Sequence, residues 1–365
     1  MRDEPANRTF FLYNTVCSIT IYDGRAEVDE ILDGAKEMAF QIRRMLDFYD
    51  VESELGRLNG RHETGVPYEV SEELCRFLAE LLKFSVLSEG CFDPTVGPVV
   101  RLWNITARSP KKPSKEEVER ARSRTGAEYV NCDTLRRTVT FERDEMVVDA
   151  GGAGKGYAVG RVAEYLKSRG VRSASVNFGG NLYLIGGKRL AGSSAAGVEA
   201  GTATGVETGA EARAADGTAA GVEVGTTTEV KAESADVVEA PWKIGIRAPW
   251  SREMKSIGTM ELQDCGTATS GGYDRYFSED EKIYHHLLDP RTGYPADNTL
   301  DSVTIVSDNA LYTDLLSTAC FVAGEDAVDR ICRRVGGRVD YVLVKKDGTI
   351  TVSDGLRTHF KRNDS

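Results

Sequence analysis

The sequence predicts an α+β fold, in which mixed β-sheet layers pack against helices. β-branched and aromatic residues fill segment 10–24 up to an Asp-Gly turn, helical periodicity follows at 28–45, and hairpin patterns occur at 134–149 and 341–355. With 365 residues, 41% of them hydrophobic, the chain is long enough for one large domain or two intimate lobes. We therefore expect residues 1–365 to form a single domain.

Five helices are predicted from apolar residues spaced three and four apart and from capping residues. A capping box formed by Ser114 and Glu117 marks the third helix. Gly170 is expected to end the fourth helix. The predicted helices cover 28–45, 71–90, a segment from 114, 157–169 and 309–323.

Strands are expected between the helices. The second strand of the 134–149 hairpin should lead directly into a glycine-rich loop, and segment 173–187 should form a further strand broken by Gly179 and Gly180. Alternating apolar residues between two tryptophans predict a core strand at 241–250.

Segment 191–240 differs in composition from the rest of the chain. It consists mainly of Ala, Gly, Thr and Glu in loosely repeated runs and holds no aromatic residue. Such a segment buries too little apolar area to offset the entropy of ordering. We expect a disordered surface insertion between two strands.

The net charge of -11 excludes some partners. Non-specific binding to nucleic acid or to an anionic membrane requires clustered Lys and Arg, which this chain lacks. No apolar run approaches the roughly 20 residues needed to span a bilayer. We expect no nucleic-acid partner and no membrane span.

The seven cysteines are odd in number and show none of the two-residue spacings of zinc or redox motifs. We expect buried free thiols, which fit a reducing compartment. As written, the chain is expected to be cytoplasmic. The sequence leaves open whether a leader was removed before this numbering begins.

The glycine-rich loop VDAGGAGKGYAVG carries one lysine, Lys155, at the start of a helix. The loop matches neither a Walker A motif, because Asp149 and Gly156 differ from it, nor the dinucleotide fingerprint. Tight packing is one interpretation. An ammonium beside a helix N-terminus is otherwise unfavourable, so Lys155 favours an anionic ligand such as a phosphate.

Asp314 and Thr318 lie four residues apart in the predicted helix 309–323, so their side chains share one face. A polar helix face is the simpler interpretation. A carboxylate and a hydroxyl together with a backbone carbonyl also suffice for Mg²⁺, which keeps other ligands as water or phosphate oxygens.

Three further segments concentrate polar groups. On an extended strand, His285 and His286 point opposite ways, so one can face a site while the other packs. Asp93 and Thr95 lie in a Pro- and Gly-rich connector, where Asp93 either caps a turn or contacts a ligand. Thr269 and Ser270 precede two glycines and suit either a phosphate, a ribose or a tight turn.

Eight motifs, taken in order, resemble the FAD:protein FMN transferases, the ApbE-type flavin transferases. The resemblance extends from about Tyr13 to Gly324 and skips only the low-complexity segment. The motifs are YNTVCSI, YDVESELGRLN, GCFDPTVGP, VDAGGAGKGYAVGRV, VNFGGNLYLIG, TSGGYDRYF, HHLLDPRTGYP and SVTIVSDNALYTDLLSTA.

The resemblance implies T-fold-related sheet layers and two intimate lobes with an FAD cleft between them. It also implies a magnesium-dependent transfer of FMN from FAD to a Thr or Ser hydroxyl of an acceptor flavoprotein, with release of AMP. By motif, Mg²⁺ would be held by Asp314, Thr318 and the carbonyl of Gly152, and Lys155 would lie near the phosphates.

Other site residues follow from the same motifs. His286 aligns with the family's active-site histidine and would accept the proton of the acceptor hydroxyl. The residues implied to contact FAD are Tyr13, Tyr49, Ser53, Asp93, Thr95, Lys155, Thr269, Ser270 and His286. The chain departs from the common GGIAKG loop at Ala153 and Gly154.

Two alternatives use the same site. With water as nucleophile, the protein would be a Mg²⁺-dependent FAD pyrophosphatase that releases FMN and AMP. A non-catalytic FAD-binding protein would instead keep FAD intact when magnesium is supplied.

Overall fold

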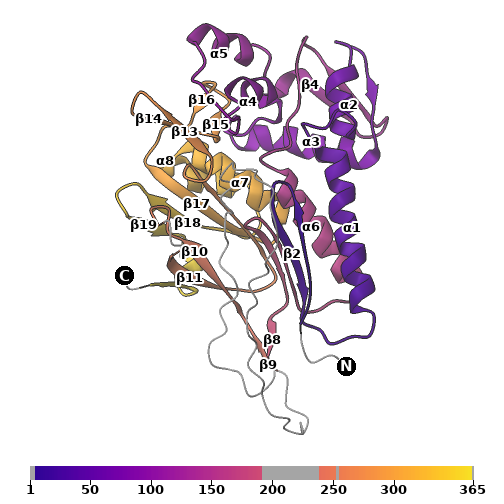
Figure 1. The fold of residues 1–365 in the computed structure, drawn as a ribbon, viewed down its shortest axis with the longest axis vertical. Helices are drawn as coiled ribbons and strands as arrows, with labels where there is room; N and C mark the ends of the chain where they lie inside the picture. Colours follow the sequence, from indigo (N-terminus) through magenta and orange to yellow (C-terminus); the bar gives the residue numbers. More distant parts are fainter. Residues whose placement is uncertain (1–4, 191–237, 252–254, 364–365) are drawn as a thin grey trace, which may run out of the picture.

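A computed structural model describes residues 5–190, 238–251 and 255–363 (Figure 1). The central element is an eight-stranded sheet in the order β1-β2-β6-β7-β12-β17-β18-β19. These strands are β1 Ala6–Leu12, β2 Thr15–Ile21, β6 Ala174–Phe178, β7 Asn181–Ile185, β12 Gly266–Gly271, β17 Leu300–Ser307, β18 Val339–Lys345 and β19 Ile350–Val352.

Helices cover one face of this sheet (Figure 1). Helix α1 packs on α6, α6 packs on α7, and α7 lies against β12 and β17. The apolar face expected between 28 and 45 is buried in α1, and Asn309 caps α7 as expected. The bounds are α1 Val28–Leu46, α6 Gly154–Ser168, α7 Ala310–Ala323 and α8 Glu325–Val335, which packs on α7.

A small sheet covers part of the opposite face. Its order is β10-β11-β20, and its apolar side chains form a second core with residues of β7, β17 and β18. Trp242 is buried there, as predicted, whereas Trp250 is exposed. The bounds are β10 Trp242–Arg247, β11 Ser256–Leu262 and β20 Phe360–Arg362.

A second lobe lies beyond one end of the main sheet (Figure 1). Ser71 caps α3, and Ser114 with Glu117 forms the predicted capping box of α5. The lobe contains α2 Glu54–Arg61, α3 Glu72–Leu87, α4 Gly97–Trp103, α5 Lys115–Arg122, the 3₁₀ helices Pro94–Val96 and Ala127–Tyr129, and strands β3 Tyr68–Glu69, β4 Val130–Asp133 and β5 Thr138–Phe141. The remaining short elements are β8 Lys188–Leu190, β9 Val238–Ala240, β13 Tyr276–Glu279, β14 Lys282–His285, β15 Leu288–Asp289, β16 Tyr294–Pro295 and the 3₁₀ helix Asp354–Leu356.

The α+β class is confirmed, but two features differ from the expectation. Every strand pair in the described residues is antiparallel rather than mixed. Of the range 191–240, the last three residues form β9, which pairs with β8; residues 191–237 lie outside the described residues.

Three strand predictions were wrong in detail. The opening segment and segment 173–187 each form a hairpin, turning at Tyr13–Asn14 and at Gly179–Gly180, where all four residues have positive φ. The hairpin predicted at 134–149 lies earlier, as β4 and β5. Residues 142–153 form no strand, and α6 begins at Gly154, three residues before the predicted start.

All seven cysteines are free, and six of them are buried, as expected. In the described residues, no helix has the length and apolar character that crossing a membrane requires.

Candidate active site

The glycine-rich loop and α7 meet at Gly156 and Asp314. The Gly156 N–H donates a 2.8 Å hydrogen bond to Oδ2 of Asp314, a buried carboxylate. A Cβ on Gly156 would lie 2.5 Å from the Cβ of Asp314 and 2.6 Å from the carbonyl oxygen of Ala310. Only glycine therefore permits this approach of α6 to α7.

Gly152 and Thr318 form a second contact between the same segments. A Cβ on Gly152 would lie 3.5 Å from Oγ1 of Thr318 and 3.2 Å from the ring of Phe92. Ser270 approaches from β12, with its Oγ 3.5 Å from Thr318 Oγ1 and 2.9 Å from Ser317 Oγ. The structure thus brings together all three predicted metal ligands, Gly152, Asp314 and Thr318.

These groups suit a hard cation. They supply one carboxylate, one hydroxyl and one backbone carbonyl, and Oδ1 of Asp314 has no hydrogen-bond partner among the described residues. The described residues contain no cluster of three His, Cys, Asp or Glu side chains able to hold a metal. A cation at this place would therefore depend on hydroxyl and backbone oxygens, a donor set that fits Mg²⁺.

Lys155 extends from the first turn of α6 toward a different set of groups. Its ammonium acts electrostatically on Cys17, Asp274 and His286. The Lys155 ammonium has no hydrogen bond or ion pair within the described ranges, so its charge is available to a ligand. The N-cap residue of α6, Ala153, provides no side-chain cap either.

His286 lies close to Lys155 and Arg275. Desolvation by the surrounding protein, followed by the positive charge of Arg275, lowers the pKa of His286 to about 3. Its Nδ1 is 3.3 Å from the Arg275 carbonyl oxygen, which only accepts, so Nδ1 carries the proton of the neutral ring. The lone pair on Nε2 is left to accept a proton.

His285 has the structural role expected for one of the two histidines. Its Nε2 lies 3.0 Å from the carbonyl oxygen of Ala296, and its ring packs edge-on against Phe321 of α7. Burial lowers its pKa. His285 therefore fixes the strand from which His286 projects.

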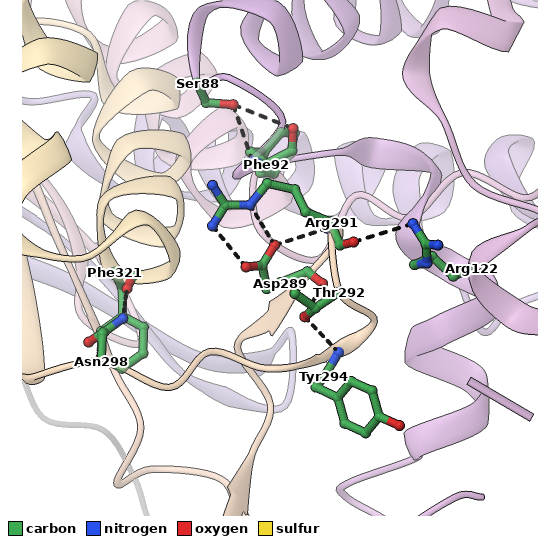
Figure 2. A network of polar contacts seen from close by, with 9 residues as sticks. All are labelled: Ser88, Phe92, Arg122, Asp289, Arg291, Thr292, Tyr294, Asn298 and Phe321. Atoms are coloured by element: carbon green, nitrogen blue, oxygen red, sulfur yellow. Dashed lines mark hydrogen bonds and ion pairs between the residues drawn. The ribbon is translucent and has the colours of Figure 1, made fainter. Parts of the chain in front are cut away.

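The turn after His286 is held by Asp289 and Arg291 (Figure 2). The Arg291 guanidinium donates to both carboxylate oxygens of Asp289, over 2.9 and 2.8 Å. Arg122 donates to the Arg291 carbonyl oxygen, and the Trp103 indole donates to that of Gly293. Asp289 thus has a structural role, joining the His286 segment to helices α4 and α5.

Tyr49 offers an aromatic face near the loop. Its ring is 74% exposed and packs edge-on against Phe48. The charges of Asp149 and Arg275 act on the Tyr49 hydroxyl, so this residue lies near the start of the glycine-rich loop and near Arg275. This position fits the predicted stacking on a planar ligand.

The hydroxyls of Ser53 and Thr95, which were predicted to contact FAD, are engaged within the protein. Ser53 is 1% exposed and caps α2, accepting from Gly56 N–H and donating to the Asp47 carbonyl oxygen. Thr95 is fully buried, donates to Asp93 and accepts from Gly126 N–H. Both hydroxyls are satisfied inside the protein, which gives these residues a structural role, and their contact with FAD stays a prediction.

Asp93, Tyr13 and Thr269 are also engaged within the protein. The Asp93 carboxylate accepts from the backbone N–H and hydroxyl of Thr95 and from Ala127 N–H, and burial raises its pKa. The Tyr13 hydroxyl donates to the Ala39 carbonyl oxygen. Thr269 shares a hydrogen bond with Thr304, on the sheet face opposite Ser270. The side chains of Asp93 and Tyr13 remain half-buried, and their contact with FAD stays a prediction.

Sequence reasoning missed three charged residues at this site, Asp149, Asp274 and Arg275. Burial raises the pKa of Asp149 to about 6, although its Oδ1 accepts from Gly151 N–H. Burial also raises the pKa of Asp274, against the opposing effects of Arg247 and Lys155. The available signal was their place in the sequence motifs. Asp149 opens the glycine-rich loop, and Asp274 and Arg275 follow Ser270 in the motif TSGGYDRYF.

Comparison with known proteins identifies the family of this chain. The ApbE family model matches residues 13–200 and 200–343. This chain belongs to the ApbE family. Two curated relatives of the chain carry the name FAD:protein FMN transferase. The protein from Treponema pallidum is 28% identical over 96% of this chain and 87% of its own length, and that from Haemophilus influenzae is 26% identical over 86% and 78%.

Solved ApbE structures are also similar to the chain. The ApbE protein from Thermotoga maritima has a TM-score of 0.76 at 27% identity and covers 98% of this chain and 100% of its own. The flavin transferase ApbE from Vibrio cholerae has a TM-score of 0.73 at 25% identity, with 98% and 99% covered. The ApbE fold predicted from the sequence is confirmed.

Proposed function

We propose that this ApbE protein transfers FMN from FAD to a Thr or Ser hydroxyl of an acceptor protein and releases AMP. The observation that carries the proposal is the contact of the glycine-rich loop with α7, which brings Asp314 and Thr318 up to the loop that carries Lys155. The two curated relatives, both named FAD:protein FMN transferase, support the same reaction.

Asp314, Thr318 and the Gly152 carbonyl would hold Mg²⁺. When bound, the ion would supply Lewis-acid stabilisation of the charge that develops on the diphosphate. Water and phosphate oxygens would complete its set of ligands, as is usual for magnesium.

Lys155 would also bind the diphosphate, through its ammonium group. The uncapped N-terminus of α6 adds positive potential in the same direction. Holding the diphosphate between fixed positive groups orients it for in-line attack, and positioning supplies much of the catalysis in phosphoryl-type substitution.

His286 would act as the general base. The acceptor oxygen forms a bond to the phosphorus of the FMN half, the bond from that phosphorus to AMP breaks, and the hydroxyl proton moves to Nε2 of His286. In the free protein, the low pKa of His286 keeps its imidazole ring neutral. Negative charge on a bound diphosphate would raise the pKa toward a value useful for proton transfer.

Tyr49 would stack on a ring of FAD, because its exposed face lies beside the glycine-rich loop. The free thiols of the described residues fit a reducing compartment, which supports a cytoplasmic acceptor.

Intact-mass analysis of an acceptor protein incubated with enzyme, FAD and Mg²⁺ tests the proposal. Transfer predicts an increment equal to FMN on one Thr or Ser, together with AMP. Free FMN with an unmodified acceptor would instead indicate a pyrophosphatase, and intact FAD a binding protein.

A further inference from the structure

Asn181 is a buried polar residue that the proposed reaction does not yet use. It opens β7 directly after the Gly179–Gly180 turn and is only 4% exposed. Its Nδ2 is buried without a hydrogen-bond partner in the part of the chain that the structure describes. Leaving such a donor unpaired costs stability, so a buried unpaired amide calls for an explanation.

The side chain of Asn181 faces α6 and α7. Leu182 and Leu184 belong to the core under the small sheet, whereas Tyr183 and Ile185 belong to the core under the helices. Because side chains alternate along a strand, Asn181 lies on the same face as Tyr183. The Tyr183 hydroxyl accepts from Lys167 of α6, which confirms the direction of that face.

Along α7, Asn181 lies at the level of Asp314. The register of β7 with β12 pairs Tyr183 with Gly266 and Leu182 with Thr267, and its continuation puts Asn181 beside Ala268. A Cβ on Gly266 would lie 3.2 Å from the Cα of Ala310 at the start of α7.

Ser270 contacts Ser317 and Thr318 further along the same helix. Ala268, midway between Gly266 and Ser270, therefore lies opposite the turn that carries Asp314. Asn181, the neighbour of Ala268 on the adjacent strand, therefore also lies opposite this turn of α7.

On its other side, Asn181 lies in a row with Cys17. Asn181 pairs with Phe178, and Phe178 pairs with Cys17. Burial raises the pKa of Cys17 to about 12, and the Lys155 ammonium acts on the thiol in the opposite direction, so Lys155 lies near this row. Asn181 is thus a buried amide on the sheet face that packs against α6, which carries Lys155, and α7, which carries Asp314.

We propose that the Asn181 amide donates a hydrogen bond to a phosphate oxygen of the dinucleotide held between Lys155 and Asp314. This inference rests on the proposed function, which supplies the diphosphate. A hydrogen bond to a charged oxygen would satisfy the N–H that is unpaired in the free protein.

Three proteins test the proposal: the wild type, Asn181→Leu and Asn181→Asp. Leu removes the unpaired amide at similar volume, and Asp replaces the donor with a negative acceptor. Asn177→Asp is the matched control, because Asn177 lies at the other end of the same turn and uses its Oδ1 to accept from Gly180 N–H, which Asp preserves.

We expect Asn181→Leu to bind FAD about 10- to 100-fold more weakly by fluorescence titration, without a lower free energy of unfolding. Asn181→Asp should bind more weakly still, and Asn177→Asp should bind as the wild type does. A purely structural role predicts the reverse, a less stable Asn181→Leu protein with native affinity for FAD.

Wild-type affinity in Asn181→Leu, beside a wild type that binds FAD and transfers FMN, would overturn this inference alone. A wild type that neither binds FAD nor transfers FMN would overturn the proposed function, and this inference with it.

Discussion

Gly156 and Asp314 are 158 residues apart in sequence, yet the N–H of one donates to the carboxylate of the other over 2.8 Å. The same contact leaves no room for a side chain at position 156, where a Cβ would lie 2.5 Å from that of Asp314. This one relationship sets the spacing of α6 and α7 and the place of the glycine-rich loop beside Thr318.

We expect Gly156→Ala to lower the free energy of unfolding by about 1–3 kcal/mol, because the added methyl group overpacks the contact between α6 and α7. FMN transfer should fall with it, since Gly152 moves relative to Thr318. Urea denaturation and a transfer assay measure the two effects.

Gly160→Ala on the same helix is the matched control. Its Cβ would lie 3.4 Å from the Cβ of Ala310, an ordinary contact, so stability should stay the same or rise by up to about 1 kcal/mol. Equal stability of the two variants would show that the close approach at Gly156 is not required.

Asp149→Asn should stabilise the protein at neutral pH. Burial raises the pKa of Asp149 to about 6, above its value near 3.9 in an unfolded chain. The stability that protonated Asp149 contributes is complete below about pH 4 and is lost as pH rises through 6. Asn keeps an oxygen for Gly151 N–H without the charge.

At pH 7 the gain should reach about 2 kcal/mol, and it should shrink toward zero at pH 4. Thermal or urea denaturation of both proteins across this range measures the difference. A gain that is independent of pH, or a loss at pH 7, would contradict the burial of an ionised Asp149.

His286→Asn should reduce kcat for FMN transfer by about 10²- to 10⁴-fold, the range of general-base contributions, with little change in stability. Because the free-protein pKa of His286 is about 3, the variant should lose activity throughout pH 5–8 and not only above 6.5.

His285→Asn provides the comparison. This substitution removes the contacts with Ala296 and Phe321, so it should lower the free energy of unfolding more than it lowers kcat. A native rate and pH profile in His286→Asn would exclude His286 as the base.

Local sequence signals predicted α1, α3, α5, α6 and α7, and missed α2, α4 and α8. Asn309 accepts from the N–H groups of Leu311 and Tyr312 at the start of α7, and such a cap is recognisable without any tertiary information. The turn at Tyr13–Asn14 was missed because Tyr13 has a φ of 54°, a conformation for which tyrosine is no signal.

The candidate site was less accessible to sequence reasoning. Ser53 and Thr95 carry hydroxyls that suit a ligand as well as they suit a cap, and only burial in the folded protein separates the two roles. The meeting of Gly152 with Asp314 and Thr318 depends on how distant segments pack, so it was inferred only through resemblance to a family. Asn181 gave no signal in the sequence, because its place on the face toward the helices follows from the register of β7 in the folded sheet.

The central claim is that Asp314 makes FMN transfer depend on a divalent cation, and a magnesium titration of the transfer reaction in wild type and Asp314→Asn tests it most directly. Asn retains an oxygen that accepts from Gly156 N–H, so the variant should fold. We expect saturable Mg²⁺ dependence in the wild type and a loss of at least about 100-fold in rate, with no recovery by millimolar Mg²⁺, in Asp314→Asn. An Asp314→Asn protein that transfers FMN with the magnesium dependence of the wild type would contradict the account.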